Sequence, residues 1–328
     1  MTTVLLTGAT GFVGRHLLRE LLDGGIAVRA LSRSAGADEV LRAAGAVPVR
    51  GDLALPPTLA AAVDAGLDAV FHTAADTSTW RAEAPRQTVV NVDGTRALAQ
   101  AARAAGVRFV HTASVSSFSH LAHGTLTEDT PRLGGQSWVN YERSKYLGEE
   151  AVRAEMAAGL QATILYPAHI FGPGDTHNWS RLVQLVDRGE LPGAPPGSGA
   201  FADVREVARA HVAAWQRECW GRSYLLGGEH AAFLDLIQRI GTRLRRRVPA
   251  RATPAVALKA YARVQELIAK LRGRKPTLTA EAAQFTCHHL AVDSSRAQRE
   301  LDYRITPLDR LLDDTIGWMR ESGMLVAR

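Results

Sequence analysis

Cysteine, lysine and long apolar runs are all scarce in this chain. Its two cysteines, Cys219 and Cys287, cannot form a disulfide framework, and their separation offers no paired-thiolate metal site. No stretch reaches the roughly 18 uninterrupted apolar residues that a membrane-spanning helix needs, and no basic leader opens the sequence. We therefore expect a cytoplasmic protein that is neither secreted nor membrane-spanning.

The net positive charge rests almost entirely on arginine. Lysine and arginine total 39 against 33 acidic residues, only four of the 39 are lysine, and the arginines are spread along the chain. With 46% hydrophobic residues the composition is that of an ordinary globular protein. A solvated basic surface is therefore favoured over a nucleic-acid interface. The eleven histidines show no metal-ligand spacing, so no metal site is expected.

Short apolar runs alternate with segments of helical period over the first 168 residues. This order predicts an α/β protein with a Rossmann-type, doubly wound parallel sheet. We expect a helix after each of the first five strands. The six expected strands are Val4–Thr7, Ala27–Leu31, Val47–Arg50, Ala69–Thr73, Arg108–Thr112 and Ala162–Tyr166.

The repeat breaks after Pro167, where the turn-rich stretches GPGD and LPGAPPGSG follow. We therefore predict a dinucleotide-binding domain over residues 1–168, with residues 200–226 packing back on it. A smaller, mostly helical substrate-binding region is expected over residues 169–199 and 227–328.

One helical segment, residues 255–272, has both an apolar and a basic side. Apolar residues such as Leu258, Tyr261 and Leu271 fall on one side, and Lys259 and Lys270 fall on another. A helix docked on the body with a solvated basic face is favoured. The alternative is weak peripheral contact with an anionic membrane, or contact with a lipid-like substrate.

A glycine-spaced loop, TGATGFVG, follows the first expected strand and opens a helix. Gly8 would allow the tight turn, Gly11 would let the backbone approach a pyrophosphate, and Gly14 would let the helix lie close to the sheet. Amide groups at the helix N-terminus would then face the anion. The loop predicts cofactor contacts from Gly8, Thr10, Gly11, Phe12, Val13 and Gly14.

Residues after the second expected strand bear on the choice of cofactor. An NAD site commonly has an acidic residue there to hold the ribose 2′-hydroxyl, but this strand ends Leu-Ser-Arg-Ser. The planar guanidinium of Arg33 is suited to a 2′-phosphate. NADP(H) is therefore favoured, with NAD(H) as the alternative.

Tyr141 and Lys145 are four residues apart at the start of a helix, so their side chains share one face. We predict that Tyr141 is the general acid/base, with its phenolate stabilised by Lys145 and by a nicotinamide ring. Lys145 could also bond the nicotinamide ribose. Ser114, just past the fifth strand, would bond the substrate oxygen, and Ser116 and Ser117 are competing candidates.

Two loops are expected to open onto the nicotinamide end of the site. They carry Trp80 and Trp179, which are candidate walls of an apolar substrate pocket, although packing under a loop is an equal alternative. His169 and His177 are weaker candidates for acid/base partners, since histidines near turns are more often structural.

Several further motifs extend this pattern over nearly the whole chain. They are GDL, HTAA, NVDGT, HTASVSS, YERSK, YPAHIFGP and ADVREVARAH. With TGATGFVG they resemble the extended short-chain dehydrogenase/reductase family in its atypical branch, including dihydroflavonol-4-reductase-like, 3β-hydroxysteroid-dehydrogenase-like and hopanoid-associated sugar-epimerase-like proteins.

The resemblance implies further roles. Asp52 and Leu53 would contact adenine, the stretch Thr73, Ala74 and Ala75 would line the cofactor, and the backbone from Pro167 to Ile170 would hold the nicotinamide end. Asn91 would belong to the cofactor-binding residues. Bracing of the sheet and relay of protons are equal alternatives for its role. Members commonly form homodimers through the helices that carry Asn91 and Tyr141.

Two positions depart from the pattern of many members. Tyr166 stands where they carry arginine, and residues 196–204 lack the arginine common in sugar-nucleotide enzymes. The favoured function is therefore NADP(H)-dependent reduction of a ketone, or oxidation of a secondary alcohol, on a mid-sized and partly apolar small molecule. The alternatives are an epimerase or dehydratase of a sugar or sugar nucleotide with retained NAD(P), and a non-catalytic NADP-binding sensor.

Overall fold

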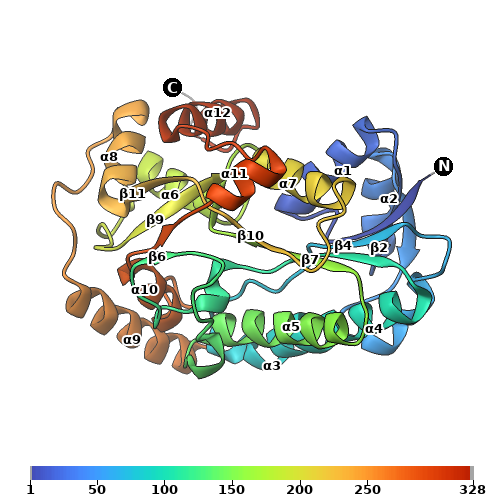
Figure 1. Cartoon of the computed structure of the whole chain (residues 1–328). Coiled ribbons are helices and arrows are strands. Elements are labelled where there is room, and N and C mark those ends of the chain that lie inside the picture. The colour runs from blue at the N-terminus through green and yellow to red at the C-terminus, as the bar shows by residue number, and fades with distance from the viewer. Residues whose placement is uncertain (1, 326–328) are drawn as a thin grey trace.

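Seven parallel strands form the central sheet in the part of the chain that the computed structural model describes, residues 2–325 (Figure 1). Their order is β10-β7-β5-β4-β1-β2-β3. The chain adds β2 and β3 on one side of β1 and then β4, β5, β7 and β10 on the other, so the topological switch point lies between β1 and β4. This Rossmann-type sheet confirms the predicted fold class. The strands are β1 (Thr3–Thr7), β2 (Ala27–Ser32), β3 (Val47–Arg50), β4 (Ala69–His72), β5 (Arg108–Thr112), β7 (Ala162–Pro167) and β10 (Ser223–Leu226).

Helices cover both faces of this sheet, so its inner strands are almost continuously apolar. On one face lie α1 (Phe12–Asp23), α2 (Ala35–Ala43), α7 (Val204–Gln216) and α11 (Ser295–Leu301). The other face is covered by α4 (Thr95–Ala105) and α5 (Asn140–Ala157), which lie with α3 (Ala84–Thr88) below the sheet in Figure 1.

The six predicted strands lie within one residue of their expected bounds, but the helix expected after the third strand is wrong. Two short 3-10 turns occupy that connection, η1 (Pro56–Thr58) and η2 (Ala60–Ala62). Pro56 and Pro57 cannot donate backbone hydrogen bonds at its start, and the Asp64 carboxylate accepts from the Gly66 amide at 2.9 Å at its end. Too few residues remain between these features for an α-helix.

The rest of the chain builds a second layer beside the carboxyl ends of the strands. A three-stranded sheet has the order β11 (Glu229–Ala232), β9 (Ser198–Asp203), β8 (His169–Phe171). It shares an apolar cluster with α6 (Trp179–Arg188), α8 (Phe233–Leu244) and α12 (Leu308–Glu321). Two further short strands, β6 (Thr125–Leu126) and β12 (Ala291–Val292), pair in parallel.

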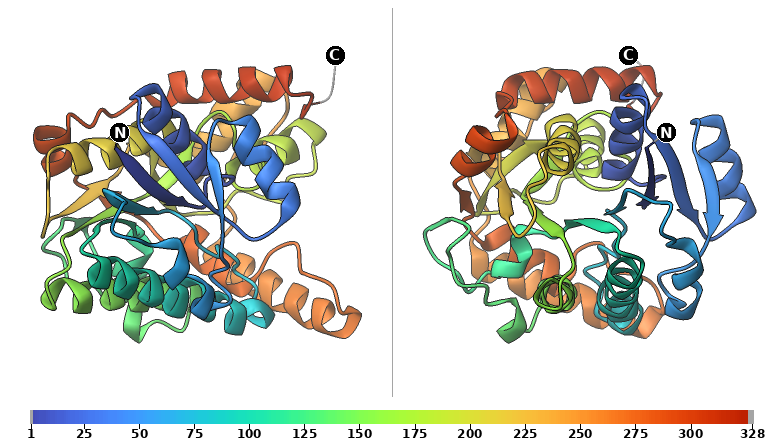
Figure 2. Two further views of the ribbon diagram at one scale, coloured as in Figure 1. Left: turned by 90° about the vertical axis from the view of Figure 1, so that its right-hand side faces the viewer. Right: turned by 45° about the vertical axis from the view of Figure 1, so that its right-hand side comes forward.

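Helices α9 (Ala255–Arg272) and α10 (Ala280–Cys287) pack on each other at the edge of this layer, and Figure 2 shows α9 reaching past the body in its left view. The remaining short elements are η3 (Arg81–Glu83), the π-helix η4 (Val89–Gly94), η5 (Val115–Phe118) and η6 (Gly134–Gln136). None of the helices within residues 2–325 is both long enough and apolar enough to cross a membrane.

Candidate active site

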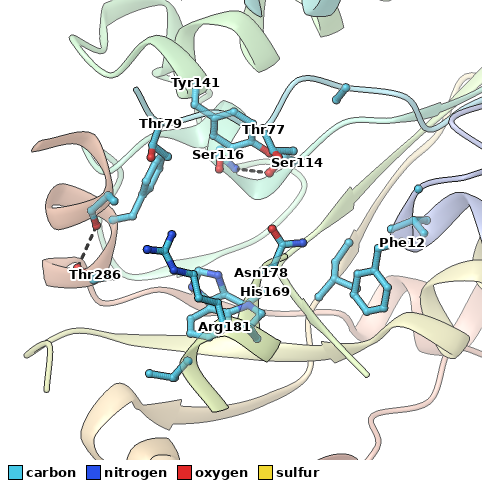
Figure 3. A pocket seen from close by; sticks show the side chains of 18 of the residues that line it. Phe12, Thr77, Thr79, Ser114, Ser116, Tyr141, His169, Asn178, Arg181 and Thr286 are labelled. Carbon is cyan, nitrogen blue, oxygen red and sulfur yellow. Dashed lines mark hydrogen bonds between the residues drawn. The ribbon is translucent and has the colours of Figure 1, made fainter. Parts of the chain in front are cut away.

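A cavity of about 1080 Å³ opens at the carboxyl ends of the central strands and extends toward α6, α8, α9 and α10. At one end it is lined by the glycine loop and by the residues that follow β2 and β4. Figure 3 shows Ser114, Ser116 and Tyr141 along one wall, with Asn178 and Arg181 on the opposite side. The cavity therefore joins the predicted cofactor and catalytic residues to the second layer.

The glycine loop has the geometry that a pyrophosphate cradle needs. Gly8 has a φ of +74°, and a Cβ added there would lie 2.8 Å from the amide nitrogen of Ala74. A Cβ at Gly14 would lie 1.9 Å from the Gly8 carbonyl oxygen, so only glycine lets α1 lie this close to the loop. Because α1 begins at Phe12, its free N-terminal amides lie beside the cavity.

Arg33, Asp52 and Leu53 line the same end of the cavity. Arg33 is exposed, and among the described residues its guanidinium has no ion-pair partner. The nearby Asp38 is already paired, since its Oδ2 lies 2.5 Å from an Arg50 nitrogen. An unpaired cation therefore faces the region where the adenosine ribose of a dinucleotide would lie.

Lys145 is buried behind the wall of the cavity, one helical turn after Tyr141. Its Nζ donates a 2.8 Å hydrogen bond to the backbone oxygen of Thr112, the last residue of β5. Burial lowers the pKa of Lys145 to about 8, against an opposing effect of the Glu149 carboxylate. The Lys145 side chain is therefore still mostly protonated near neutral pH but loses its proton only slightly above it.

Tyr141 and Ser114 line the cavity together. Burial raises the pKa of the Tyr141 phenol, a hydrogen bond with the Ser114 side chain lowers it, and the Asp76 carboxylate raises it. Ser114 caps η5, and its Oγ accepts from the Ser116 amide at 3.1 Å. The Ser114 side chain is thereby held at the end of β5, within reach of the phenol.

Asn91 lies in the π-helix η4 and is buried outside the cavity wall. Its Oδ1 accepts from the Asp76 amide at 2.7 Å, and its Nδ2 donates to the Asp76 carbonyl at 2.9 Å and to Ser144 Oγ at 3.0 Å. The side chain thus ties the loop after β4 to helix α5. The implied bracing role fits this placement, but the bracing runs from loop to helix and not within the sheet.

The predicted substrate residues divide into two groups. Ser116 and Trp179 line the cavity, whereas Trp80 and His177 are absent from the lining in the described part of the chain. The loop after β4 directs Thr77 and Thr79 inward instead of Trp80, and the turn after β8 directs Asn178 inward instead of His177. A proposed substrate role for Trp80 and His177 therefore lacks support.

Trp179 also packs into an aromatic cluster, in which His169 and Phe233 line the cavity as well. Its ring lies 5.2 Å from those of His169 and Phe201 and is stacked at 5.6 Å on Phe233. Burial lowers the pKa of His169 to about 4, with His288 acting in the same direction. A neutral, ring-packed histidine supports the structural interpretation of His169 over an acid/base role.

Several residues that line the cavity were not among the predicted site residues, although some of them lie in segments that the sequence singled out. Arg181 extends from α6 into the cavity (Figure 3), and it occupies the i+2 position after Trp179. Residues 255–272 were expected to form a helix, with contact to a lipid-like substrate as one alternative, and Leu258 and Tyr261 of this helix line the cavity. The overlooked lining residues include Thr77, Thr79, Asn178, Arg181, Leu258, Tyr261, Phe285, Thr286 and His288.

Most of the remaining predicted cofactor contacts lie around the cavity. Thr10, Val13, Thr73, Ala74, Ala75 and Ile170 line it, whereas Pro167 ends β7 behind it. Tyr166, which departs from the family pattern, is buried away from the cavity and donates to Glu149 at 2.5 Å. No group of three or more His, Cys, Asp or Glu side chains among the described residues is arranged to hold a metal ion.

A glycine cradle at the switch point of a doubly wound sheet, with tyrosine and lysine one turn apart beside it, defines the class of NAD(P)-binding proteins of the short-chain dehydrogenase/reductase type. Comparison with known proteins agrees with this. The model of the NAD dependent epimerase/dehydratase family matches residues 4–227, so the chain belongs to that family, the extended branch of the class.

Two named relatives and one solved structure match nearly the whole chain. It is 31% identical to sterol demethylase protein B of Methylococcus capsulatus, over 98% of this chain and 100% of the relative. It is 30% identical to 2-alkyl-3-oxoalkanoate reductase of Stenotrophomonas maltophilia, over 92% and 94% respectively. The crystal structure of gox2253 superposes with a TM-score of 0.83 at 30% identity, covering 99% of this chain and 100% of that one.

Proposed function

We propose that this protein is an NADP(H)-dependent oxidoreductase that reduces a ketone, or oxidises a secondary alcohol, on a mid-sized and partly apolar substrate. The observation that carries the proposal is the continuity of the cavity from the glycine loop, past Ser114 and Tyr141, to a largely apolar end. Apolar lining at that end comes from Leu182, Leu185, Ile237, Leu258, Leu278 and Phe285.

Tyr141 is the proposed proton donor in the direction of reduction. Because burial raises the pKa of its phenol, the protonated form predominates near neutral pH. The bound nicotinamide would supply hydride to the carbonyl carbon. The phenol gives its proton to the substrate oxygen, while the Ser114 hydroxyl donates a hydrogen bond to that oxygen as its negative charge grows.

Lys145 acts on the same reaction through its charge. The ammonium is held by Thr112 at 2.8 Å, one turn along α5 from Tyr141. A positive charge at this place favours the phenolate that remains after proton transfer. In the reverse direction the Tyr141 phenolate accepts the proton of the substrate alcohol. The Lys145 charge favours formation of this phenolate.

Preference for the phosphorylated cofactor rests on Arg33. Its unpaired guanidinium lines the adenosine end of the cavity, and no carboxylate among the described lining residues at the end of β2 replaces it. Such a guanidinium can bond a 2′-phosphate in bidentate fashion, whereas a free 2′-hydroxyl offers it much less.

The names of two relatives, a sterol demethylase protein and a 2-alkyl-3-oxoalkanoate reductase, support an apolar substrate. The epimerase/dehydratase description of the family favours a second candidate, an epimerase or dehydratase that retains its cofactor. Against a sugar nucleotide, β9 (Ser198–Asp203) is wholly buried and carries no arginine.

A substrate panel tests the proposal. Alkyl and polycyclic ketones would be compared with sugar nucleotides, each with NADPH and with NADH. We expect the highest kcat/KM for an apolar ketone with NADPH. Turnover confined to sugar nucleotides would overturn the substrate class, and equal kcat/KM with NADH would overturn the cofactor preference alone.

A further inference from the structure

Helix α9 presents a broad apolar face to solvent. Of its 18 residues, only Ala262 and Ala269 are buried, and they form the seam against the body of the protein. Leu267 is 62% exposed and Leu271 is 81% exposed. The exposed large apolar residues of the helix are Val256, Tyr261, Val264, Leu267, Ile268 and Leu271.

These six side chains form one surface. At about 100° per residue they fall within roughly 140° of arc around the helix. Isolated exposed apolar residues are ordinary, but a contiguous set on one helix face marks an interaction site. We call this set the α9 apolar face.

Basic side chains border the α9 apolar face. Lys259, Arg263 and Lys270 fall together within about 40° of arc along one edge, and Arg272 lies at the other. The helix has a single acidic residue, Glu266, whose Oε1 accepts from the Ala280 amide at 2.9 Å. An apolar face between basic edges is the pattern of helices that lie in the surface of an anionic bilayer.

The α9 apolar face also adjoins the cavity. Leu258 and Tyr261 line the cavity, and Tyr261 belongs to the exposed set as well. In Figure 2 (left) α9 lies at a lower corner of the molecule, where nothing of the described chain stands in front of it. A flat surface can therefore reach the helix without displacing another element.

We propose that α9 docks this protein on an anionic phospholipid bilayer, with the α9 apolar face inserted among the acyl chains and the basic edges at the headgroups. The charge argues against a second copy as the occupant, since a second copy would offer the same cationic helix. A bilayer rich in anionic lipid supplies the opposite charge and an apolar layer together.

The test is sedimentation of the full-length protein with vesicles. Phosphatidylcholine vesicles would be compared with vesicles that contain about one third phosphatidylglycerol. We expect binding to the anionic vesicles that weakens severalfold at high salt. Leu267→Asp should reduce the partition coefficient about tenfold or more, whereas Leu55→Asp should not, because Leu55 is similarly exposed at 58% but is not part of the α9 apolar face.

A second pair of variants isolates the charge. Arg263→Gln with Lys270→Gln should weaken binding, whereas Arg42→Gln with Arg310→Gln, also exposed, should not. Failure of the wild type to bind anionic vesicles, or equal loss in the Leu55 or Arg42/Arg310 controls, would overturn the proposal. A wild-type dimer that Leu267→Asp converts to monomer would assign the face to a second copy instead. Vesicle binding is measured without any substrate, so it stands or falls independently of the proposed reaction.

Discussion

The side chain of Lys145 ties helix α5 to the end of strand β5 by donating a 2.8 Å hydrogen bond to the carbonyl oxygen of Thr112. Ser114 follows Thr112 by two residues, and Tyr141 precedes Lys145 by one helical turn. One buried cation therefore holds together the two segments that carry the proposed proton donor and the proposed oxygen ligand.

Replacing Lys145 with methionine should change the pH profile as well as the rate. Burial and Asp76 already raise the pKa of Tyr141. Loss of the ammonium removes a positive charge that favours the phenolate, so the pKa should rise further. We expect kcat for alcohol oxidation to fall about 100-fold, with its rising limb moved to higher pH. The measurement is kcat for alcohol oxidation against pH. A uniform loss with an unmoved profile would reduce Lys145 to a structural role.

Tyr141→Phe removes only the phenolic oxygen. We expect kcat to fall by about 100-fold or more, because proton transfer then has no donor, while NADPH binding measured by fluorescence titration stays within about twofold. Tyr146→Phe is the matched control, since Tyr146 lies on the same helix but does not line the described cavity. Full activity in the Tyr141 variant would exclude the proposed acid.

Arg33→Asp should reverse the cofactor preference. Loss of the guanidinium removes a charge-assisted bond to the 2′-phosphate, so KM for NADPH should rise about tenfold to 100-fold while KM for NADH changes little. Arg42→Asp serves as control, since it makes the same charge change on the surface of α2. Equal effects on both cofactors would remove Arg33 from the cofactor site.

Buried histidines should make stability depend on pH. His211 Nδ1 donates to the Val207 carbonyl at 2.7 Å, and Nε2 accepts from Thr112 Oγ1 at 2.8 Å, so the ring is neutral. Burial lowers the pKa of His211 to about 4, against an opposing effect of that Val207 bond. Unfolded histidine binds its proton near pH 6.5, so stability is lost as pH falls from about 6.5 to 4.

In the wild type, the free energy of unfolding should fall between about pH 6.5 and pH 4, and His211→Gln should make this fall smaller by up to about 3 kcal/mol. Urea unfolding at several pH values measures it, with exposed His230→Gln as control. If the pH dependence of the wild type and the His211 variant is the same, the buried neutral ring is not its source.

The central sheet could be predicted from the sequence because each inner strand is a continuous apolar run followed by a helix of regular period. It missed β10, because the four residues Ser223–Leu226 carry no alternation and their place beside β7 depends on a long-range parallel pairing. It also expected a helix where Pro56 and Pro57 leave only 3-10 turns.

At the site, local spacing was sufficient for the glycine loop and for Tyr141 and Lys145, because each lies within one turn of backbone. The substrate end was not predictable in this way. Thr77 and Asn178 replace the expected Trp80 and His177 because the direction of a loop side chain depends on backbone angles that residue type does not specify. Phe285 comes from α10, which packing alone brings to the cavity.

The most direct test of the central claim is the stoichiometry between NADPH oxidised and alcohol formed. Purified protein with a ketone that it turns over would be followed by absorbance for NADPH and by chromatography for product. The proposed oxidoreductase predicts one NADPH consumed for each alcohol produced, continuing over many turnovers. Product formed with a retained cofactor and no net consumption of NADPH would contradict it and assign the protein to epimerase or dehydratase chemistry.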